Sequence, residues 1–343
     1  PSIQGCKMMK KIKGLEEYVQ WSVYRQALGL PEDHEEQYEL LAQGEYNINY
    51  FFVHPITRKR LILRLNTASQ MHLENQIEYE YQTLKFLENS GHTPKVYYCD
   101  GSKQKLMYGV LVMEFLDGKS LDYTKDVQVG LRILSDIHAI KVPENTHLLR
   151  PKSGPEAMLL ECRNMFIQYK KSSLCEKKIQ SRVEMMLDTM GERIKAVKMI
   201  APYLCCINTE LNNTNFLINP QGQNSLIDWE KPLYADPAQD IGHYLAPTTS
   251  FWKTDIIFDF LQIEEDIEHY IEEVNGRFDC TGLRERIMNY IPLNCMRGLT
   301  WCAMAWVEYH QPNRAIFNVD TYEKLSEYLS DSFLSKIEEL VLY

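Results

Sequence analysis

Residues 206–229 read CINTELNNTNFLINPQGQNSLIDW, and this stretch is the most informative part of the chain. It places an acid at Glu210, an amide five residues later at Asn215, and a second acid at Asp228, at the end of an apolar run. Turn-forming residues at 220–224 separate two short β-rich runs. The stretch therefore predicts a polar loop followed by a hairpin.

The three polar side chains suit the transfer of a phosphoryl group. Magnesium bound to a triphosphate prefers hard oxygen ligands and keeps several waters. The protein therefore needs to supply only one carboxylate and one amide carbonyl as ligands. Asp228 and Asn215 are the candidate metal ligands. The reaction also needs a carboxylate that accepts the proton of the attacking hydroxyl. Glu210 is the candidate for that catalytic role.

The stretch resembles the signature of the aminoglycoside phosphotransferase and choline kinase family, which reads H-G-D-x-x-x-x-N, two short strands and then I-D-W or I-D-F. Asn215 and Asp228 match the two magnesium ligands of that signature. Asn208 replaces its leading histidine, and Glu210 replaces its catalytic aspartate. The added methylene shifts the carboxylate by about an ångström, and such a misplacement can cost on the order of a hundredfold in rate. The resemblance implies Mg²⁺, with ATP or GTP as the co-substrate.

Two further positions follow from the same resemblance. Residues 235–240 read ADPAQD and are similar to the G-D-P-x-x-D of the family. This implies that Asp240 holds the catalytic loop through hydrogen bonds and takes no part in the chemistry. His138 lies where the family often has a histidine, and we expect a buried core histidine whose hydrogen bonds are satisfied.

The first third of the chain resembles the phosphate-binding part of the family. Gly44 and Asn47 resemble its G-x-x-N loop, in which glycine lets backbone amides approach phosphate, although both residues also suit an ordinary turn. Arg64 is the single cation in the apolar strand LILRL, and a buried cation needs a partner. The resemblance implies that Glu80 pairs with Arg64, which holds the phosphates. An outward-facing Arg64 in a surface salt bridge is the alternative.

Residues 111–118, LVMEFLDG, are similar to the hinge of the family. The resemblance implies that backbone groups near Glu114 and Phe115 bind the adenine edge, while Val112 and Met113 line the base pocket.

Hydrophobic periodicity changes near residue 116. Before it, we predict a helix at 9–30, strands at 38–42, 46–53, 60–66, 95–99 and 108–115, and a helix at 72–89. After it, we predict mainly helices, including 125–140 and 179–197, around a short-strand pair formed by 203–207 and 216–229. This order predicts an α+β, bilobed protein-kinase-like fold with a small antiparallel sheet. Residues 1–115 form the nucleotide-binding lobe with its leading helix, and residues 116–343 form the helical lobe with the catalytic hairpin and the acceptor site.

The composition excludes several classes of protein. Among the 343 residues, 45% are hydrophobic and 24% are charged, as in ordinary globular proteins, and no apolar run is long enough to span a membrane. The net charge of −10 argues against nucleic acid as a partner. Nine cysteines form no C-x-x-C pair, and the chain does not begin with a secretory signal pattern. We expect reduced cysteines and a cytoplasmic protein.

The leading hypothesis is an enzyme that moves the γ-phosphoryl group of ATP or GTP to a hydroxyl of a small molecule of the aminoglycoside or choline class. A nucleotide-binding pseudokinase that acts as a sensor or partner-binding module is the alternative. A protein-directed transferase is a third reading, although no A-P-E segment follows Asp228. The acceptor would contact the helical segment 159–198 and the final helices. Aromatic residues there form either a pocket or part of the core: Trp252, Trp301, Trp306 and Tyr309.

Overall fold

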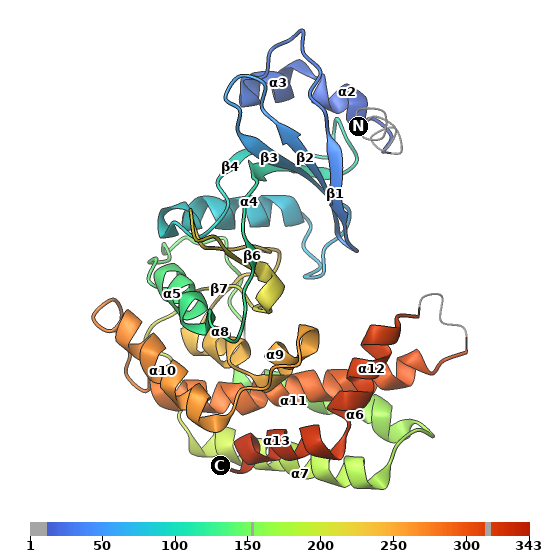
Figure 1. Ribbon diagram of the computed structural model, residues 1–343, viewed down its shortest axis with the longest axis vertical. Helices are drawn as coiled ribbons and strands as arrows, with labels where there is room; N and C mark the ends of the chain where they lie inside the picture. Colours follow the sequence, from blue (N-terminus) through green and yellow to red (C-terminus); the bar gives the residue numbers. More distant parts are fainter. Residues whose placement is uncertain (1–11, 152–153, 313–316) are drawn as a thin grey trace. The chain divides into compact units, whose positions relative to one another are not determined.

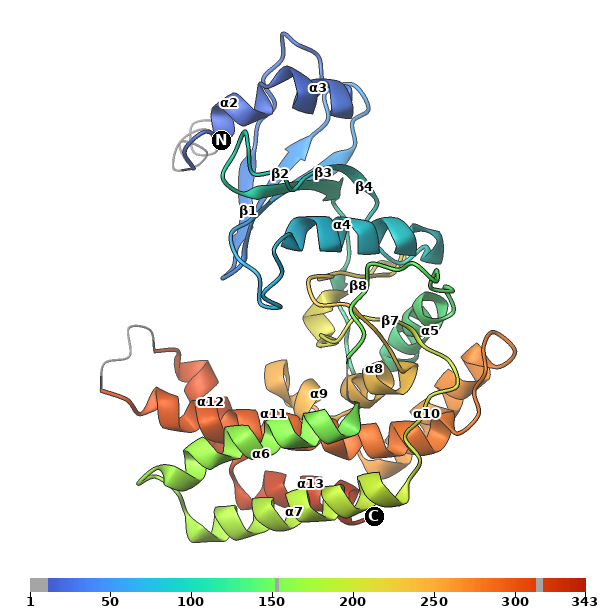
Figure 2. The same ribbon diagram turned by 180° about the vertical axis from the view of Figure 1, so that it is seen from behind.

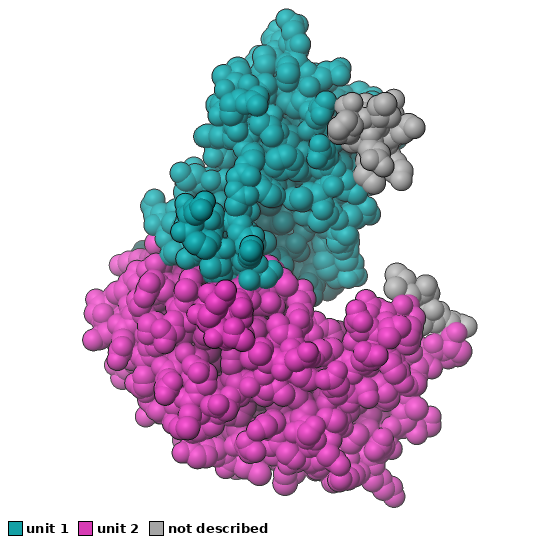
Figure 3. Space-filling view, in the orientation of Figure 1, with its two compact units in different colours: residues 1–120, 143–148, 216–232 teal, residues 121–142, 149–215, 233–343 magenta. Residues whose placement is uncertain are grey.

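The computed structural model describes residues 12–151, 154–312 and 317–343, and the chain divides into two compact units (Figure 3). Unit 1 comprises the residues up to 120 together with 143–148 and 216–232. Unit 2 comprises residues 121–142, 149–215 and 233–343. The predicted boundary at 115 lies close to the end of the first segment of unit 1, whereas the hairpin at 216–232, which we predicted within the C-terminal lobe, clusters with unit 1.

Unit 1 is built around a five-stranded antiparallel sheet with the order β1-β2-β3-β5-β4 (Figure 1). Its strands are β1 (Glu39–Gln43), β2 (Asn47–Val53), β3 (Arg60–Asn66), β4 (Val96–Asp100) and β5 (Gly109–Glu114). Short turns join the first three strands as the predicted meander. The bounds of β3 coincide with the predicted run, and the other four strands are displaced by a single residue at one or both ends.

The two faces of this sheet pack against different helices. Leu63, Tyr50 and Val112 share one face and belong to a buried cluster with α2 (Leu15–Val19) and α3 (Ser22–Leu28). Successive side chains of a strand alternate between faces, so Arg64 lies on the opposite face. There α4 (Gln76–Leu87), followed by the 3₁₀ turn η1 (Glu88–Ser90), packs against β4 and β5. The alternation therefore separates an apolar face from a face that carries polar groups.

The helix predicted at 9–30 is two short helices within the described residues, and residues 9–11 lie outside them. Extended backbone at Trp21 separates α2 from α3. α3 ends as predicted at Gly29, whose φ of 66° is a left-handed conformation that glycine adopts at little cost. Arg25 of α3 is buried and pairs with Glu36 at 2.9 Å, which fixes α3 to the segment that leads into β1.

A second, smaller sheet completes unit 1. The hairpin of β8 (Phe216–Ile218) and β9 (Ser225–Leu226) pairs with β6 (Lys119–Ser120) in the order β6-β8-β9. Gly118, just before β6, approaches β8 so closely that a Cβ would lie 2.9 Å from the carbonyl carbon of Leu217. Glycine is therefore required at this crossing.

The prediction that the run at 203–207 pairs with the hairpin is wrong. β7 (Cys205–Ile207) pairs instead with β10 (Leu233–Ala235), in antiparallel register within unit 2. The two strands are short and distant in sequence, and their hydrophobic pattern alone does not specify which partner completes the pair.

Unit 2 is mainly helical and is organised around the 27-residue helix α11 (Leu283–Tyr309), along which α6 lies (Figure 2). The other elements of unit 2 are α5 (Val127–His138), α6 (Pro155–Lys171), α7 (Lys177–Ala196), η2 (Asn213–Asn215), α8 (Pro237–Tyr244), α9 (Pro247–Lys253), α10 (Phe260–Val274), α12 (Val319–Tyr328) and α13 (Asp331–Leu342). The predicted helices at 125–140 and 179–197 correspond to α5 and α7.

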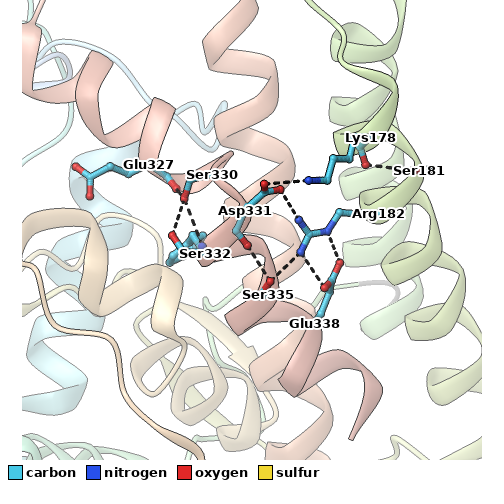
Figure 4. A network of polar contacts seen from close by, with 10 residues as sticks. Lys178, Ser181, Arg182, Glu327, Ser330, Asp331, Ser332, Ser335 and Glu338 are labelled. Carbon is cyan, nitrogen blue, oxygen red and sulfur yellow. Dashed lines mark hydrogen bonds and ion pairs between the residues drawn. The ribbon is translucent and has the colours of Figure 1, made fainter.

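A polar network fixes α7 against α13 (Figure 4). Arg182 of α7 donates two hydrogen bonds to Glu338, of 2.6 and 2.9 Å. It also donates to Asp331 at 2.9 Å and to Ser335 at 3.0 Å. Lys178, one helical turn earlier, reaches Asp331 at 2.9 Å. These contacts anchor the predicted helical segment to the C-terminal helix.

No helix within the described ranges is both long enough and apolar enough to cross a bilayer.

The described residues include eight cysteines, all of them free. Cys205 and Cys206 are buried residues of β7.

Candidate active site

Arg64 lies in the middle of β3, with 11% of its side chain exposed. Its Nη1 donates to Oε1 of Glu80 on α4, and its Nε donates to Oδ1 of Asn49 on β2 at 2.9 Å. The predicted pair is confirmed. The alternative of a surface salt bridge is wrong, because the Glu80 side chain is 2% exposed.

Glu230 joins this pair from the segment that follows β9. Its Oε1 lies 3.8 Å from Nη1 of Arg64 and accepts a hydrogen bond from Nδ2 of Asn47. Its main-chain oxygen accepts from Nε2 of Gln76 at 2.8 Å. The segment just after Asp228 is therefore fixed to β2, β3 and α4 within unit 1.

Carboxylates outnumber the cation in this cluster. Burial lowers the pKa of the Arg64 guanidinium, but the surrounding acids raise it further, so Arg64 stays charged. Those acids are Glu80, Glu230 and Asp228. Burial also raises the pKa of Glu80 to about 7, while Arg64 opposes that rise. This surplus of negative charge is an environment that favours a bound cation.

Asp228 has a left-handed backbone, with φ of 66°. Such a conformation costs a non-glycine residue on the order of 1–3 kcal/mol and persists only where the surroundings enforce it. The next residue, Trp229, is buried and donates from Nε1 to the main-chain oxygen of Leu226 at 2.9 Å. Strained backbone of this kind gathers at functional sites.

Gly44 lies in the exposed turn between β1 and β2, where its N–H donates to the main-chain oxygen of Asn47 at 2.9 Å. A Cβ on Gly44 would meet no atom closer than that oxygen, at 3.8 Å. The side chain of Asn47 is buried and also accepts a hydrogen bond from Asn66 at 3.1 Å. Gly44 and Asn47 therefore lie at a turn between two strands, as expected. The binding of phosphate by these residues remains a prediction.

The predicted base pocket needs one correction. Val112 lies opposite Leu63 in the apolar cluster, whereas Met113 lies opposite Ile62 on the face that carries Arg64. Both residues cannot line one pocket, because neighbouring side chains of a strand point to opposite faces. The assignment is wrong for Val112 and remains a prediction for Met113.

The hinge amides already have partners. The N–H groups of Glu114 and Phe115 donate to the main-chain oxygens of Lys95 and Arg60, at 2.8 and 3.0 Å. These bonds hold the end of β5 in the sheet. Because both N–H groups are occupied, only the carbonyl oxygens of Glu114 and Phe115 could bind the adenine edge. Their binding of adenine remains a prediction.

Glu210 and Asn215 lie in one loop of unit 2, residues 208–215, which we call the 208–215 loop. Oδ1 of Asn208 accepts from the N–H of Glu210 at 2.9 Å, so the residue that replaces the signature histidine closes a tight turn. Nδ2 of Asn215 donates to the main-chain oxygen of Glu210 at 2.8 Å. Because an amide group is planar, this bond points Oδ1 of Asn215 away from the main-chain oxygen of Glu210.

Asp240 holds the start of the 208–215 loop. Its Oδ2 accepts from the N–H of Asn208 at 2.8 Å, and its Oδ1 accepts from the N–H of Thr209 at 3.0 Å. His138 is fully buried between Asp240, at 3.1 Å, and the hydroxyl of Tyr270, at 2.7 Å. The structural role expected of Asp240 and the core position expected of His138 are both confirmed.

Sequence reasoning missed two residues of this region. Thr209 has a left-handed backbone, with φ of 74°, where the resembling signature has glycine. The glycine of H-G-D was the available signal. Glu230 completes the cluster around Arg64, and its position two residues after Asp228 was the only hint of that contact.

The structure places the predicted residues in two groups. Unit 1 carries Gly44, Asn47, Arg64, Glu80, Met113, Glu114, Phe115 and Asp228. Unit 2 carries Glu210 and Asn215. Contacts to Glu230 link Asn47 and Arg64 within unit 1, and one hydrogen bond links the two residues of unit 2.

The four aromatic residues of the predicted acceptor region are partly exposed, so the reading of them as buried core is wrong. Trp301 is 42% exposed, and the other three are half-buried. Trp252 meets Trp301 edge to face, with 5.5 Å between the ring centroids, and Trp306 stacks on Tyr322 at 5.1 Å. Aromatic side chains therefore contribute to the surface formed by α9, α11 and α12.

A model of the phosphotransferase enzyme family matches residues 37–270. A spectinomycin phosphotransferase solved with ADP and spectinomycin has a TM-score of 0.62 and 12% identity, over 95% of this chain and 97% of that chain. A choline kinase from Cryptosporidium parvum Iowa II has a TM-score of 0.63 and 15% identity, over 95% and 96%. A microcompartment-associated aminopropanol kinase has a TM-score of 0.60 and 16% identity, over 92% and 94%. No curated protein matches the sequence. The likeness to these structures confirms the predicted kinase-like α+β fold.

Proposed function

The chain belongs to the phosphotransferase enzyme family and is a small-molecule kinase, and we propose that it transfers the γ-phosphoryl group of ATP, with Mg²⁺, to a hydroxyl group of its acceptor. The observation that carries this proposal is the 2.8 Å hydrogen bond from Asn215 to the main-chain oxygen of Glu210. It joins the two residues of the 208–215 loop that the reaction needs, a proton acceptor and a metal ligand.

The donor groups fit Mg²⁺, which would neutralise charge on the phosphates when bound. We assign the carboxylate of Asp228 and Oδ1 of Asn215 as its ligands, as the family signature implies. Both are hard oxygen donors, and phosphate oxygens and water complete such a coordination shell. Two observations support the assignment: the surplus of carboxylates around Arg64, and the orientation of the Asn215 amide set by its bond to Glu210.

Glu210 is proposed to accept the proton of the attacking hydroxyl. Its main chain is held from both ends of the loop, by Asn208 at its N–H and by Asn215 at its oxygen. Asp240 in turn fixes the residues just before it. A base held in this way can keep its carboxylate within hydrogen-bond reach of the acceptor, as proton transfer requires.

The nucleotide would be held by unit 1. We assign the phosphates to Arg64, oriented by Glu80 and Asn49, and to the turn that contains Gly44 and begins β2 at Asn47. The adenine is assigned to Met113 and to the carbonyl oxygens of Glu114 and Phe115. ATP is proposed rather than GTP, since the spectinomycin phosphotransferase was solved with ADP and no observation supports the guanine nucleotide.

The acceptor is proposed to be a small molecule with a free hydroxyl, of the aminoglycoside or choline class. The names of the similar structures, spectinomycin phosphotransferase, choline kinase and aminopropanol kinase, support this class. Within unit 2, the partly exposed Trp252, Trp301 and Trp306 offer aromatic faces to such a molecule.

Calorimetric titration with ATP, with and without Mg²⁺, tests the proposal, together with transfer assays on a panel of amino alcohols and aminoglycosides. We expect Asp228→Asn to lose the Mg²⁺-dependent part of the ATP affinity. We expect Glu210→Gln to keep that affinity and to lose transfer. The control is Glu32→Gln, in the turn between α3 and β1, which is exposed and should match the parent. Equal transfer by Glu210→Gln and the parent would remove Glu210 from the mechanism, and an ATP affinity indifferent to Mg²⁺ would remove the metal site.

The departures from the signature favour one other function. Asn208, Thr209 and Glu210 replace all three residues of H-G-D, and the methylene added at position 210 displaces the base. A pseudokinase that senses ATP or binds a partner would show Mg²⁺-dependent ATP binding without phosphoryl transfer to any acceptor or to water. The same titrations and assays therefore separate the two functions.

A further inference from the structure

Lys253 is the last residue of α9, and its side chain reaches the 208–215 loop. Its Nζ donates to Oγ1 of Thr214 at 3.0 Å. Thr214 directly precedes Asn215, and its hydroxyl in turn donates to Oδ1 of Asn212 at 2.5 Å. A cation from a distant part of the sequence is therefore attached to the loop between the proposed base and the proposed metal ligand.

Lys253 is exposed and belongs to none of the ion pairs formed among the described residues. The nearby carboxylate of Asp255 pairs with Lys324 instead, at 3.1 Å. An ammonium group has three donors, and Thr214 takes one of them. The remaining donors are available to an anion at the loop.

The backbone that carries Lys253 is firmly held on both sides. Phe251 is buried and stacks on Phe333, with 5.1 Å between the centroids, while Trp252 packs edge to face against Trp301 at 5.5 Å. On the other side, Oγ1 of Thr254 donates to the main-chain oxygen of Ser250 at 2.6 Å. The position of Lys253 at the loop is thus set by the packing of α9.

We propose that Lys253 is a catalytic residue that binds the phosphoryl group during transfer, an inference that rests on the proposed function. The acceptor oxygen forms a bond to the γ-phosphorus while the bond from phosphorus to the bridging oxygen breaks, and the electron pair of that bond leaves with ADP. The hydroxyl proton passes to Glu210. Lys253 donates from Nζ to a non-bridging oxygen of the phosphoryl group, where negative charge must be stabilised.

A purely structural role must be distinguished from this one. A lysine at the C-terminus of a helix also stabilises that helix through its dipole. The chain offers a matched control, because Lys171 is the exposed last residue of α6. Lys171→Met removes the same charge from the same helical position without touching the 208–215 loop.

The test compares affinities for MgADP alone and for MgADP with aluminium fluoride, which mimics the phosphoryl group in transfer. We expect the parent to prefer the fluoride complex, and Lys253→Met to lose at least about tenfold of that preference, as the loss of a donor to developing charge usually causes. The affinity of Lys253→Met for MgADP should not change. Lys253→Arg should keep most of the preference, and Lys171→Met should keep all of it.

The outcomes separate this inference from the proposed function. A parent that binds no nucleotide contradicts the proposed function, and the role of Lys253 falls with it. A parent that binds MgADP but does not prefer the fluoride complex overturns the role of Lys253 alone. An undiminished preference in Lys253→Met, or an equal loss in Lys171→Met, also overturns it, because a donor to the phosphoryl group is then not at position 253.

Discussion

Oδ1 of Asp240 accepts a hydrogen bond of 3.0 Å from the N–H of Thr209, and Thr209 has a left-handed backbone with φ of 74°. A β-branched residue rarely adopts this conformation, because its side chain crowds the neighbouring carbonyl. The bond to Asp240 is one of the contacts that enforce it. The start of the 208–215 loop is therefore strained locally and held by tertiary contacts.

Replacing Thr209 by glycine should relieve this strain. The strain is worth about 1–2 kcal/mol, and the greater freedom of glycine in the unfolded chain offsets part of it. We expect Thr209→Gly to raise the free energy of unfolding by about 1 kcal/mol, measured by urea denaturation. Thr209→Ala keeps the Cβ and should show no such gain. A glycine variant less stable than the alanine variant would show that strain is not what limits this position.

The side-chain nitrogen of Asn215 should matter for Mg²⁺-dependent ATP binding as much as the side-chain oxygen does. Asn215→Asp keeps an oxygen donor for the metal, but it places a carboxylate oxygen against the main-chain oxygen of Glu210, where Nδ2 now donates. We expect the Mg²⁺-dependent ATP affinity to fall about 10- to 100-fold, as for other residues that orient a ligand. Asn275→Asp on the exposed end of α10 controls for the added charge. Tighter Mg²⁺-dependent binding by Asn215→Asp would contradict the orienting role.

The sequence predicted this region well where chemistry restricts the choice of residue. A lone cation in an apolar strand must be paired, and Arg64 does pair with Glu80. The role of Asp240 came from the resemblance to the family signature, and the core position of His138 from the usual burial of a histidine whose hydrogen bonds are satisfied. The face occupied by Val112 could not be predicted, because consecutive apolar residues of a buried strand carry no alternation that marks a face. The left-handed backbone of Asp228 leaves no pattern in its own residue type, whereas that of Thr209 was indicated only by the glycine at this position of the resembling signature.

Glu80 should make stability depend on pH. Burial raises its pKa to about 7 in the folded protein from 4.5, so between these values the folded state keeps a proton that the unfolded chain has lost. The contribution of Glu80 is therefore most favourable below pH 4.5 and is lost as the pH rises through 7, by on the order of 3 kcal/mol.

Urea denaturation of the nucleotide-free protein between pH 5 and pH 8, roughly the range over which Glu80 titrates, measures this effect. In Glu80→Gln the corresponding fall in the free energy of unfolding should disappear. Glu78→Gln is the control, since Glu78 lies on the same helix and is exposed. An identical pH slope in Glu80→Gln and the parent would mean that Glu80 is ionised throughout.

The fold was predictable wherever contacts are local in sequence. The bounds of β3 and the meander of β1, β2 and β3 followed from alternation and turn residues. The pairing of β7 with β10 did not, because the partner strand lies beyond the hairpin and is only three residues long. Such a pairing depends on the packing of the whole unit and not on the pattern of either strand.

The network between α7 and α13 should contribute measurably to stability. The pair of Arg182 and Glu338 is largely buried, with side chains 17% and 20% exposed. If Arg182 is replaced, the carboxylate of Glu338 loses both of the parallel hydrogen bonds that it accepts. We expect Arg182→Met to cost about 1–3 kcal/mol in urea denaturation. Lys178→Met removes an ion pair whose side chains are 69% and 68% exposed, and it should cost less than about 0.5 kcal/mol. Equal costs for both variants would show that the partly buried pair adds nothing beyond a surface contact.

Replacing Gly44 tests whether the turn between β1 and β2 binds phosphate or only connects the two strands. Its backbone does not require glycine, and a Cβ there would lie 3.8 Å from the nearest atom, so Gly44→Ala should leave stability within about 0.5 kcal/mol of the parent. If backbone amides of this turn bind phosphate, the added methyl obstructs the approach, and the affinity for MgATP should fall at least about tenfold. Adenosine, which has no phosphates, should bind both proteins equally. If MgATP binds Gly44→Ala as tightly as it binds the parent, Gly44 serves only the turn between β1 and β2, and Arg64 is left as the phosphate ligand assigned in unit 1.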